Sequence, residues 1–224
     1  MSINLLNFKG VAFDLDDTLI DRKKAFNKLC LRLVNDFECF SNFSEQEALD
    51  YFWGLNSYNS FDINFGLTEI KKRFPNFDLN YQEFYDYYYK NMSEVIEPYD
   101  GIKEFLDKLI EKKLNFGIVT NGSEYQYEKI KNTGLQDKYN FVIASEIFGH
   151  SKPKKEIYIE TIRQLNLTLE DVENVLFIGD NPYTDIIGAQ FIGMLTAWIS
   201  MGREYPKNLD PPDYIIENYK ELEI

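Results

Sequence analysis

Two aspartates follow an apolar run near the start of the chain. Asp14 and Asp16 lie two residues apart, directly after the segment 10–13 (Gly-Val-Ala-Phe), which is typical of a buried strand. Two carboxylates this close repel each other, and each is costly to bury without a partner. A sequence that places both of them at the end of a core strand therefore indicates a bound cation and a candidate active site.

Three later segments carry further polar side chains at the ends of predicted strands or in the loops that follow them. The first contains Thr120 and Asn121, the second contains Lys152, and the third contains Asp180 and Asp185. In an open α/β sheet, ligands bind at the carboxyl ends of the strands. We therefore expect these side chains to meet the two N-terminal aspartates at one edge of a sheet.

The residue types of these segments suit the transfer of a phosphoryl group. Asp14 is the candidate nucleophile, because a carboxylate can attack phosphorus and form an aspartyl phosphate. Asp16 is the candidate general acid, which protonates the departing oxygen and then accepts a proton from water. Asp14, Asp180 and the backbone oxygen of Asp16 are expected to hold Mg²⁺, a hard ion that prefers oxygen ligands. Asp185 is not expected to bind the metal itself. It is expected to orient either a metal-bound water molecule or Lys152.

Thr120, Asn121 and Lys152 are the predicted contacts of the phosphate. The first two offer a hydroxyl, an amide and backbone N–H groups at a helix start, which suits an anion, and the lysine adds a positive charge. Local positive charge is needed because the net charge of the chain is −13, and its field repels a phosphate. Arg203 is expected in a surface salt bridge, and Asp17 is expected to cap a helical turn or to face water.

Strand-like apolar segments alternate with helical patterns along most of the chain, and this alternation predicts a doubly wound α/β fold with a parallel sheet. The strand-like segments are 11–15, 116–120, 141–144, 175–179 and 196–200, with a weaker one at 213–216. From about residue 21 to residue 97 the apolar residues recur at helical spacing instead, with no clear strand. We expect a helical insertion between the first strand and the rest of the sheet.

The bulk composition narrows the possible partners. With 224 residues, 44% of them hydrophobic, the chain can bury a sizeable core. Its acidity argues against nucleic acid and anionic membranes as partners. The sequence contains no apolar stretch of about 18 residues, so no membrane span is expected. Cys30 and Cys39 are not expected to pair, and with no N-terminal signal segment the expected location is the cytoplasm. A single histidine, His150, excludes a three-histidine zinc site.

Taken in order, these motifs resemble those of the haloacid dehalogenase-like (HAD) hydrolase superfamily. The matching segments are 13–19 (Phe-Asp-Leu-Asp-Asp-Thr-Leu), 119–122 (Val-Thr-Asn-Gly), Lys152-Pro153 and 178–186 (Ile-Gly-Asp-Asn-Pro-Tyr-Thr-Asp-Ile). The resemblance implies a Rossmann-like hydrolase core formed by residues 1–18 and 98–224, with an all-helical cap domain, residues 19–97, inserted after the first motif. It assigns the nucleophile, the acid, the phosphate contacts and the Mg²⁺ ligands to the residues already named.

One residue selects a branch of the superfamily. The dehalogenases that it resembles lack the second aspartate, because a halide leaving group needs no proton, whereas this chain has Asp16. It therefore resembles the phosphatases, and we expect a Mg²⁺-dependent enzyme that hydrolyses a small phosphorylated metabolite, such as a nucleotide or a sugar phosphate. Two alternatives share every motif: a phosphomutase that acts on a sugar phosphate, and a catalytically silent binding module of the same fold.

Overall fold

The computed structural model of the protein describes residues 2–56 and 61–224, which form two compact units. Met1–Asp21 and Glu97–Ile224 make up the α/β unit, and Arg22–Ile96 make up the helical unit. The strands of the α/β unit are β1 (Ile3–Asn4), β2 (Gly10–Phe13), β3 (Phe116–Thr120), β4 (Phe141–Ala144), β5 (Val175–Gly179), β6 (Leu195–Ile199), β7 (Tyr214–Ile216) and β8 (Leu222–Glu223). Its helices are α5 (Ile102–Glu111), α6 (Tyr125–Asn132), α7 (Ser145–Phe148), α8 (Lys155–Gln164) and α9 (Ile187–Phe191), and a π-helical turn, Pro182–Ile186, precedes α9.

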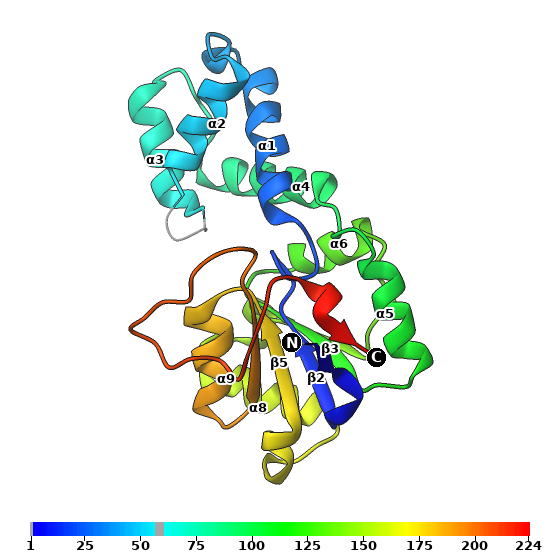
Figure 1. The fold of residues 1–224 in the computed structure, drawn as a ribbon. Helices are drawn as coiled ribbons and strands as arrows, with labels where there is room; N and C mark the ends of the chain where they lie inside the picture. Colours follow the sequence, from blue (N-terminus) through cyan, green and yellow to red (C-terminus); the bar gives the residue numbers. More distant parts are fainter. Residues whose placement is uncertain (1, 57–60) are drawn as a thin grey trace. The chain divides into compact units, whose positions relative to one another are not determined.

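Six parallel strands form the main sheet, in the order β4-β3-β2-β5-β6-β7 (Figure 1). This arrangement confirms the predicted doubly wound α/β class. Strand β2 lies between β3 and β5, because the chain builds one half of the sheet through β3 and β4 and then returns to β2 to build the other half. Such a point, where the direction of winding changes, is where open α/β sheets bind their ligands.

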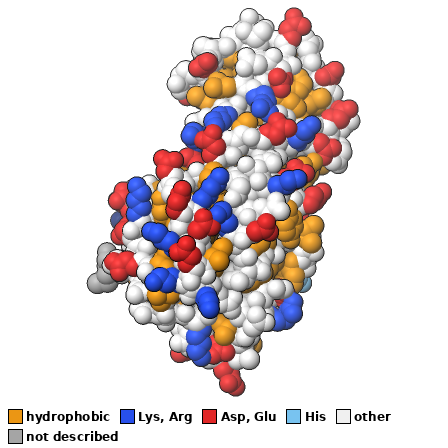
Figure 2. Space-filling view, turned by 90° about the vertical axis from the view of Figure 1, so that its right-hand side faces the viewer, with side chains coloured by type: hydrophobic (Ala, Val, Ile, Leu, Met, Phe, Trp, Pro, Cys, Tyr) orange, Lys and Arg blue, Asp and Glu red, His pale blue; other side chains and the backbone are white. Residues whose placement is uncertain are grey.

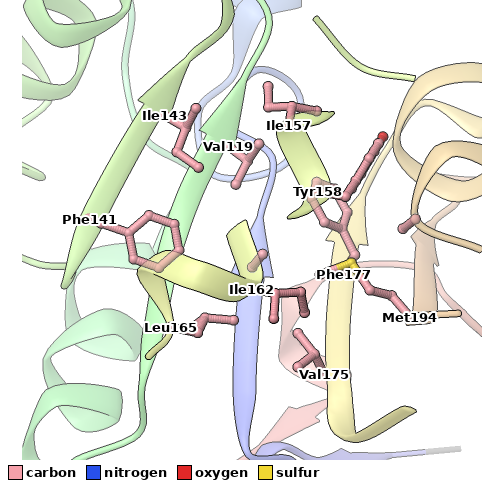
Figure 3. Packing of buried hydrophobic residues seen from close by; sticks show 12 residues of the cluster. Val119, Phe141, Ile143, Ile157, Tyr158, Ile162, Leu165, Val175, Phe177 and Met194 are labelled. Atoms are coloured by element: carbon pink, nitrogen blue, oxygen red, sulfur yellow. The ribbon is translucent and has the colours of Figure 1, made fainter. Parts of the chain in front are cut away.

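Helices on both faces explain why the central strands are apolar along their whole length. Every residue of β2, β3 and β5 is buried. Ala12 belongs to a cluster that contains Tyr158 of α8 and Phe177 of β5, seen close up in Figure 3. The next residue, Phe13, packs edge-on against Phe105 of α5, with ring centroids 6.1 Å apart. Successive side chains of a strand point to opposite faces, so both faces of β2 require apolar residues.

The helical unit contains α1 (Arg22–Asp36), α2 (Glu45–Gly54), α3 (Ile63–Arg73) and α4 (Tyr81–Val95), which confirms the predicted all-helical insertion. Capping boxes begin two of these helices, with Ser44 and Glu47 at α2 and an equivalent pair at α4. Its interior is rich in aromatic rings, and Phe40 and Phe52 pack edge-on at 5.5 Å. Cys30 is buried in α1, and both cysteines are free, as expected.

The chain leaves and re-enters the α/β unit through two paired segments, which we call the seam. The N–H group of Asp21 donates to the carbonyl of Glu97 at 2.9 Å, and the N–H group of Tyr99 donates to the carbonyl of Leu19 at 3.1 Å. Backbone hydrogen bonds therefore hold the two ends of the inserted segment next to each other.

Among the helices of the described residues, none is both long enough and apolar enough to cross a membrane.

Candidate active site

The carboxyl ends of three adjacent strands position the predicted site. Asp14 follows β2, Thr120 is the last residue of β3, and Asp180 follows β5. Strand β2 pairs in parallel with both β3 and β5, and the N–H group of Asp14 still donates to the carbonyl of Ile178 in β5 at 2.8 Å. The sheet pairing thus fixes the backbone of Asp14 before its side chain makes any contact.

Lys152 links two of the predicted site carboxylates. Its Nζ lies 2.6 Å from Oδ1 of Asp14 and 2.8 Å from Oδ1 of Asp185, and it also donates to the carbonyl of Val119 at 2.8 Å. The lysine is only 4% exposed. Burial lowers the pKa of Lys152, but the charges of Asp14 and Asp185 more than offset it, so its pKa lies above the ordinary value. The site therefore contains a buried ammonium group.

Three carboxylates converge beside this lysine. Oxygen atoms of Asp14, Asp180 and Asp185 lie within 4.8 Å of one another, and we call these residues the carboxylate group. Burial raises the pKa of Asp14, Lys152 opposes the rise, and the charges of Asp185 and Asp180 add to it, so the pKa lies well above its usual range. A divalent cation would relieve this repulsion, and an all-oxygen donor set of this kind suits Mg²⁺.

Arg203 and Trp198 hold Asp180 in place. Nη1 of Arg203 lies 3.1 Å from Oδ2 of Asp180, and Nη2 of the same guanidinium donates to the Asp180 carbonyl at 3.0 Å. The indole N–H of Trp198 donates to that carbonyl at 2.8 Å. The salt bridge expected for Arg203 is therefore present, but its partner belongs to the candidate site and the guanidinium is partly buried.

The side chain of Asp16 is directed toward α6 and makes contacts apart from the carboxylate group. Nζ of Lys129 lies 2.8 Å from each carboxylate oxygen of Asp16, and Nε2 of Gln126 donates to Oδ2 at 3.0 Å. The predicted metal contact through the Asp16 backbone oxygen stays a prediction. Of the two alternatives for Asp17, exposure to water is wrong, because the residue is 1% exposed, with a left-handed backbone at φ 58°. A capping role stays a prediction.

Thr120 and Asn121 lie at the end of β3, where the phosphate contacts were predicted. Thr120 is buried, and its Oγ1 accepts a hydrogen bond from Nε2 of Gln126. The Asn121 side chain accepts from the N–H group of Lys152 at 2.8 Å and donates to its carbonyl at 3.0 Å. Asn121 thus fixes the backbone that carries the buried lysine, in addition to any contact with a ligand.

Gln126, Lys129 and Arg203 are the contacts that the sequence did not assign to the site. The first two lie three residues apart on the helix that follows Thr120 and Asn121, so they share one helix face. A helix that begins at a ligand-binding strand end is a signal that could have drawn attention to them. Composition alone does not separate a buried lysine from an exposed one, and most lysines are exposed.

A parallel sheet that gathers carboxylates and a buried lysine at its switch point defines an α/β enzyme site. The family model of the haloacid dehalogenase-like hydrolases matches residues 11–199, so the chain belongs to this family and is a hydrolase. The resemblance drawn from the four motifs is thereby confirmed.

Relatives of known name and structure extend this comparison. The chain is 29% identical to glyceraldehyde 3-phosphate phosphatase of Pyrococcus abyssi over 205 residues, which cover 87% of this chain and 82% of the relative. It is 32% identical to a pyrimidine 5'-nucleotidase of Escherichia coli over 134 residues, 59% of this chain and 58% of that protein. A HAD hydrolase of Bacillus subtilis, solved with bound magnesium, shares the fold with a TM-score of 0.76, at 22% identity and 96% coverage of both chains.

Proposed function

We propose that this hydrolase is a Mg²⁺-dependent phosphatase that cleaves a small phosphate monoester through an aspartyl phosphate on Asp14. The observation that carries the proposal is the contact between Asp14 and the buried ammonium of Lys152, beside the carboxylate group. A nucleophile, a fixed positive charge and a candidate cation site at one strand end are the parts that phosphoryl transfer needs. Two relatives named as a phosphatase and a nucleotidase support the same class of substrate.

The first step forms the covalent intermediate. A carboxylate oxygen of Asp14 bonds to phosphorus while the ester P–O bond breaks, and the departing oxygen keeps the electron pair and takes the proton of the Asp16 carboxyl group. Lys152 offers positive charge to the phosphoryl oxygens and holds Asp14 at 2.6 Å. Mg²⁺ bound by Asp14, Asp180 and the backbone oxygen of Asp16 would supply further positive charge to the same oxygens.

The second step releases phosphate. The oxygen of a water molecule bonds to phosphorus and gives a proton to the Asp16 carboxylate, while the bond between phosphorus and the Asp14 oxygen breaks. Inorganic phosphate leaves, and both aspartates return to their starting protonation states. Asp185, which contacts Lys152 at 2.8 Å, keeps the ammonium in place throughout.

The substrate is proposed as a class of small phosphorylated metabolites. The named relatives act on different phosphates, a three-carbon aldehyde phosphate and a pyrimidine nucleotide, so they favour the phosphate monoester as the shared element. Residues 22–96, the helical unit, would act as the cap that selects the rest of the substrate. A cytoplasmic location and the absence of nucleic-acid partners stay predictions from the sequence.

Substitution of the two aspartates tests the proposal. We expect Asp14→Asn to abolish release of p-nitrophenol from p-nitrophenyl phosphate, and Asp16→Asn to lower kcat by about 10² or more, the usual contribution of a general acid or base. Asp137→Asn, at an exposed position, is the control. Circular dichroism would show that each variant is folded, and full activity of either site variant would contradict the proposal.

Two further measurements separate the alternatives. A phosphatase releases inorganic phosphate from a sugar monophosphate, whereas a phosphomutase returns the phosphoryl group to a sugar phosphate. A silent binding module would hydrolyse no phosphate monoester, with Mg²⁺ or after its removal by a chelator. Release of inorganic phosphate that depends on Mg²⁺ is the result expected here.

A further inference from the structure

Lys129 is a buried lysine whose charge the proposed chemistry has not yet used. It lies on α6, it is 5% exposed, and its Nζ contacts both carboxylate oxygens of Asp16 at 2.8 Å. A buried ammonium is costly unless it is paired, and breaking such a pair is costly as well. The contact with both oxygens fixes the direction in which the carboxyl plane of Asp16 faces.

Gln126, one turn earlier on the same face of α6, adds a second restraint. Its Nε2 donates to Oδ2 of Asp16 at 3.0 Å and to the carbonyl of Asn121 at 3.1 Å, and it also contacts Oγ1 of Thr120. One helix face therefore connects the candidate acid to the end of β3, where the phosphate contacts are proposed. This face therefore fixes the Asp16 carboxyl group relative to Thr120 and Asn121.

The two aspartates of the first motif are held by different lysines from different elements. Asp14 contacts Lys152 of the loop before α8, and Asp16 contacts Lys129 of α6. The carboxylate group includes Asp14 but not the side chain of Asp16. The two carboxylates are therefore held apart. That of Asp14 belongs to the carboxylate group, and that of Asp16 contacts α6.

We propose that Lys129 is a positioning residue that holds Asp16 where it can reach the leaving oxygen. The inference rests on the proposed function, because it assigns Lys129 to the acid of that reaction. In this role Lys129 acts through Asp16 rather than on Asp14 directly.

The dependence of the rate on the leaving group tests this role. Phenyl, p-nitrophenyl and 2,4-dinitrophenyl phosphate differ in how much the departing oxygen needs a proton, and kcat/KM reports the step in which that oxygen leaves. In Lys129→Met we expect kcat/KM to fall about tenfold or more for phenyl phosphate but less than about threefold for the dinitrophenyl ester, since a general acid contributes mainly where the leaving group is poor. Lys129→Arg should restore most of the loss, and Lys131→Met, exposed on the same helix, should change nothing.

The same series shows how the inference would fail. Equal losses for the three esters, or the same selective loss when Lys129→Met is added to Asp16→Asn, would overturn it. If the wild-type protein hydrolyses none of the esters, the proposed function fails, and a crystal structure of Lys129→Met then judges the positioning role alone. In that structure the Asp16 carboxyl group should leave its place beside α6; an unmoved carboxyl group would contradict the inference. If Lys129→Met does not fold, Lys129→Gln replaces it in both experiments.

Discussion

At the scale of the residue, Lys152 shows how a strongly acidic chain can offer positive charge to an anion. The net charge is −13, yet this ammonium lies almost entirely inside the protein and contacts two carboxylates. Low exposure means that solvent and salt screen its charge little. Because Asp14 and Asp185 already balance this charge, a cation bound at the carboxylate group would have to supply the remaining attraction for a phosphate.

The buried pair also makes a prediction about stability. Lys152→Met removes the partner of Asp14 and Asp185, and it should lower the free energy of unfolding by about 3–5 kcal/mol, the usual cost of breaking a buried ion pair. Urea unfolding in the presence of a chelator measures this without a contribution from metal. Lys131→Met is the exposed control, and a loss below about 1 kcal/mol for Lys152→Met would contradict the assigned pairing.

Residue types at the site were predictable, and the partners of their side chains were not. The sequence places Asp14 and Asp180 at strand ends and Lys152 in a loop that follows a strand, and the parallel sheet brings the two strand ends together whatever the details of packing. Whether a side chain turns toward one neighbour or another depends on rotamers and helix placement that no short motif encodes. Asp16 and Lys129, separated by 113 residues in sequence, are an example.

At the scale of the element, the end of β5 depends on a glycine. A Cβ at Gly179 would lie 2.4 Å from Oδ2 of Asp185 and 2.6 Å from its Cβ. Asp185 is 1% exposed and contacts Lys152, so it has little space to retreat. Glycine is therefore required at this position, because the Asp185 carboxylate that contacts Lys152 occupies the space of a side chain.

Gly179→Ala should destabilise the protein by about 1–3 kcal/mol, as overpacking of a tight core usually does. It should also lower kcat/KM, because Asp185 is displaced from Lys152. Gly54→Ala is the matched control, since Gly54 is exposed near the end of α2 with nothing within 4 Å of an added Cβ, and it should stabilise by up to about 1 kcal/mol through helix propensity. Thermal unfolding and steady-state kinetics of the two variants measure both effects, and wild-type behaviour of Gly179→Ala would contradict the argument.

Long apolar segments predicted the elements well, and short ones gave no signal. The segments 116–120, 141–144 and 175–179 coincide with β3, β4 and β5. The first strand was predicted to reach residue 15, but β2 ends at Phe13, and Asp14 keeps one hydrogen bond to β5 beyond that end. Strands β1 and β8 have two residues each, too few for any periodicity to be read.

At the scale of the whole molecule, one face of the surface mixes positive and negative side chains. On the face seen in Figure 2, Lys and Arg side chains are interspersed with Asp and Glu side chains, so this face offers no continuous basic surface. That agrees with a small anionic substrate that is recognised inside a site rather than a polyanion that is bound along a surface. The carboxylate group is a local concentration of negative charge that a cation would balance.

Binding of Mg²⁺ should therefore raise the thermal stability of the protein. A ligand that binds only the native state stabilises it by about 2.7 kcal/mol at 100 times its dissociation constant. We expect Tm to rise when Mg²⁺ replaces a chelator, and we expect little rise in Asp180→Asn, which removes one member of the carboxylate group. Calorimetry with Asp137→Asn as the exposed control measures this, and an undiminished rise in Asp180→Asn would place the ion elsewhere.

The seam carries a consequence for how such proteins diversify. Hydrogen bonds between residues 19–21 and 97–99 keep both attachment points of the helical unit adjacent. A helical domain from another protein would therefore need to join the chain at only two neighbouring backbone positions. The site aspartates and Lys152 belong to the α/β unit and not to the inserted block. If the block selects the substrate as proposed, exchanging it between homologous enzymes would alter which molecules are accepted while the reacting groups stay as they are.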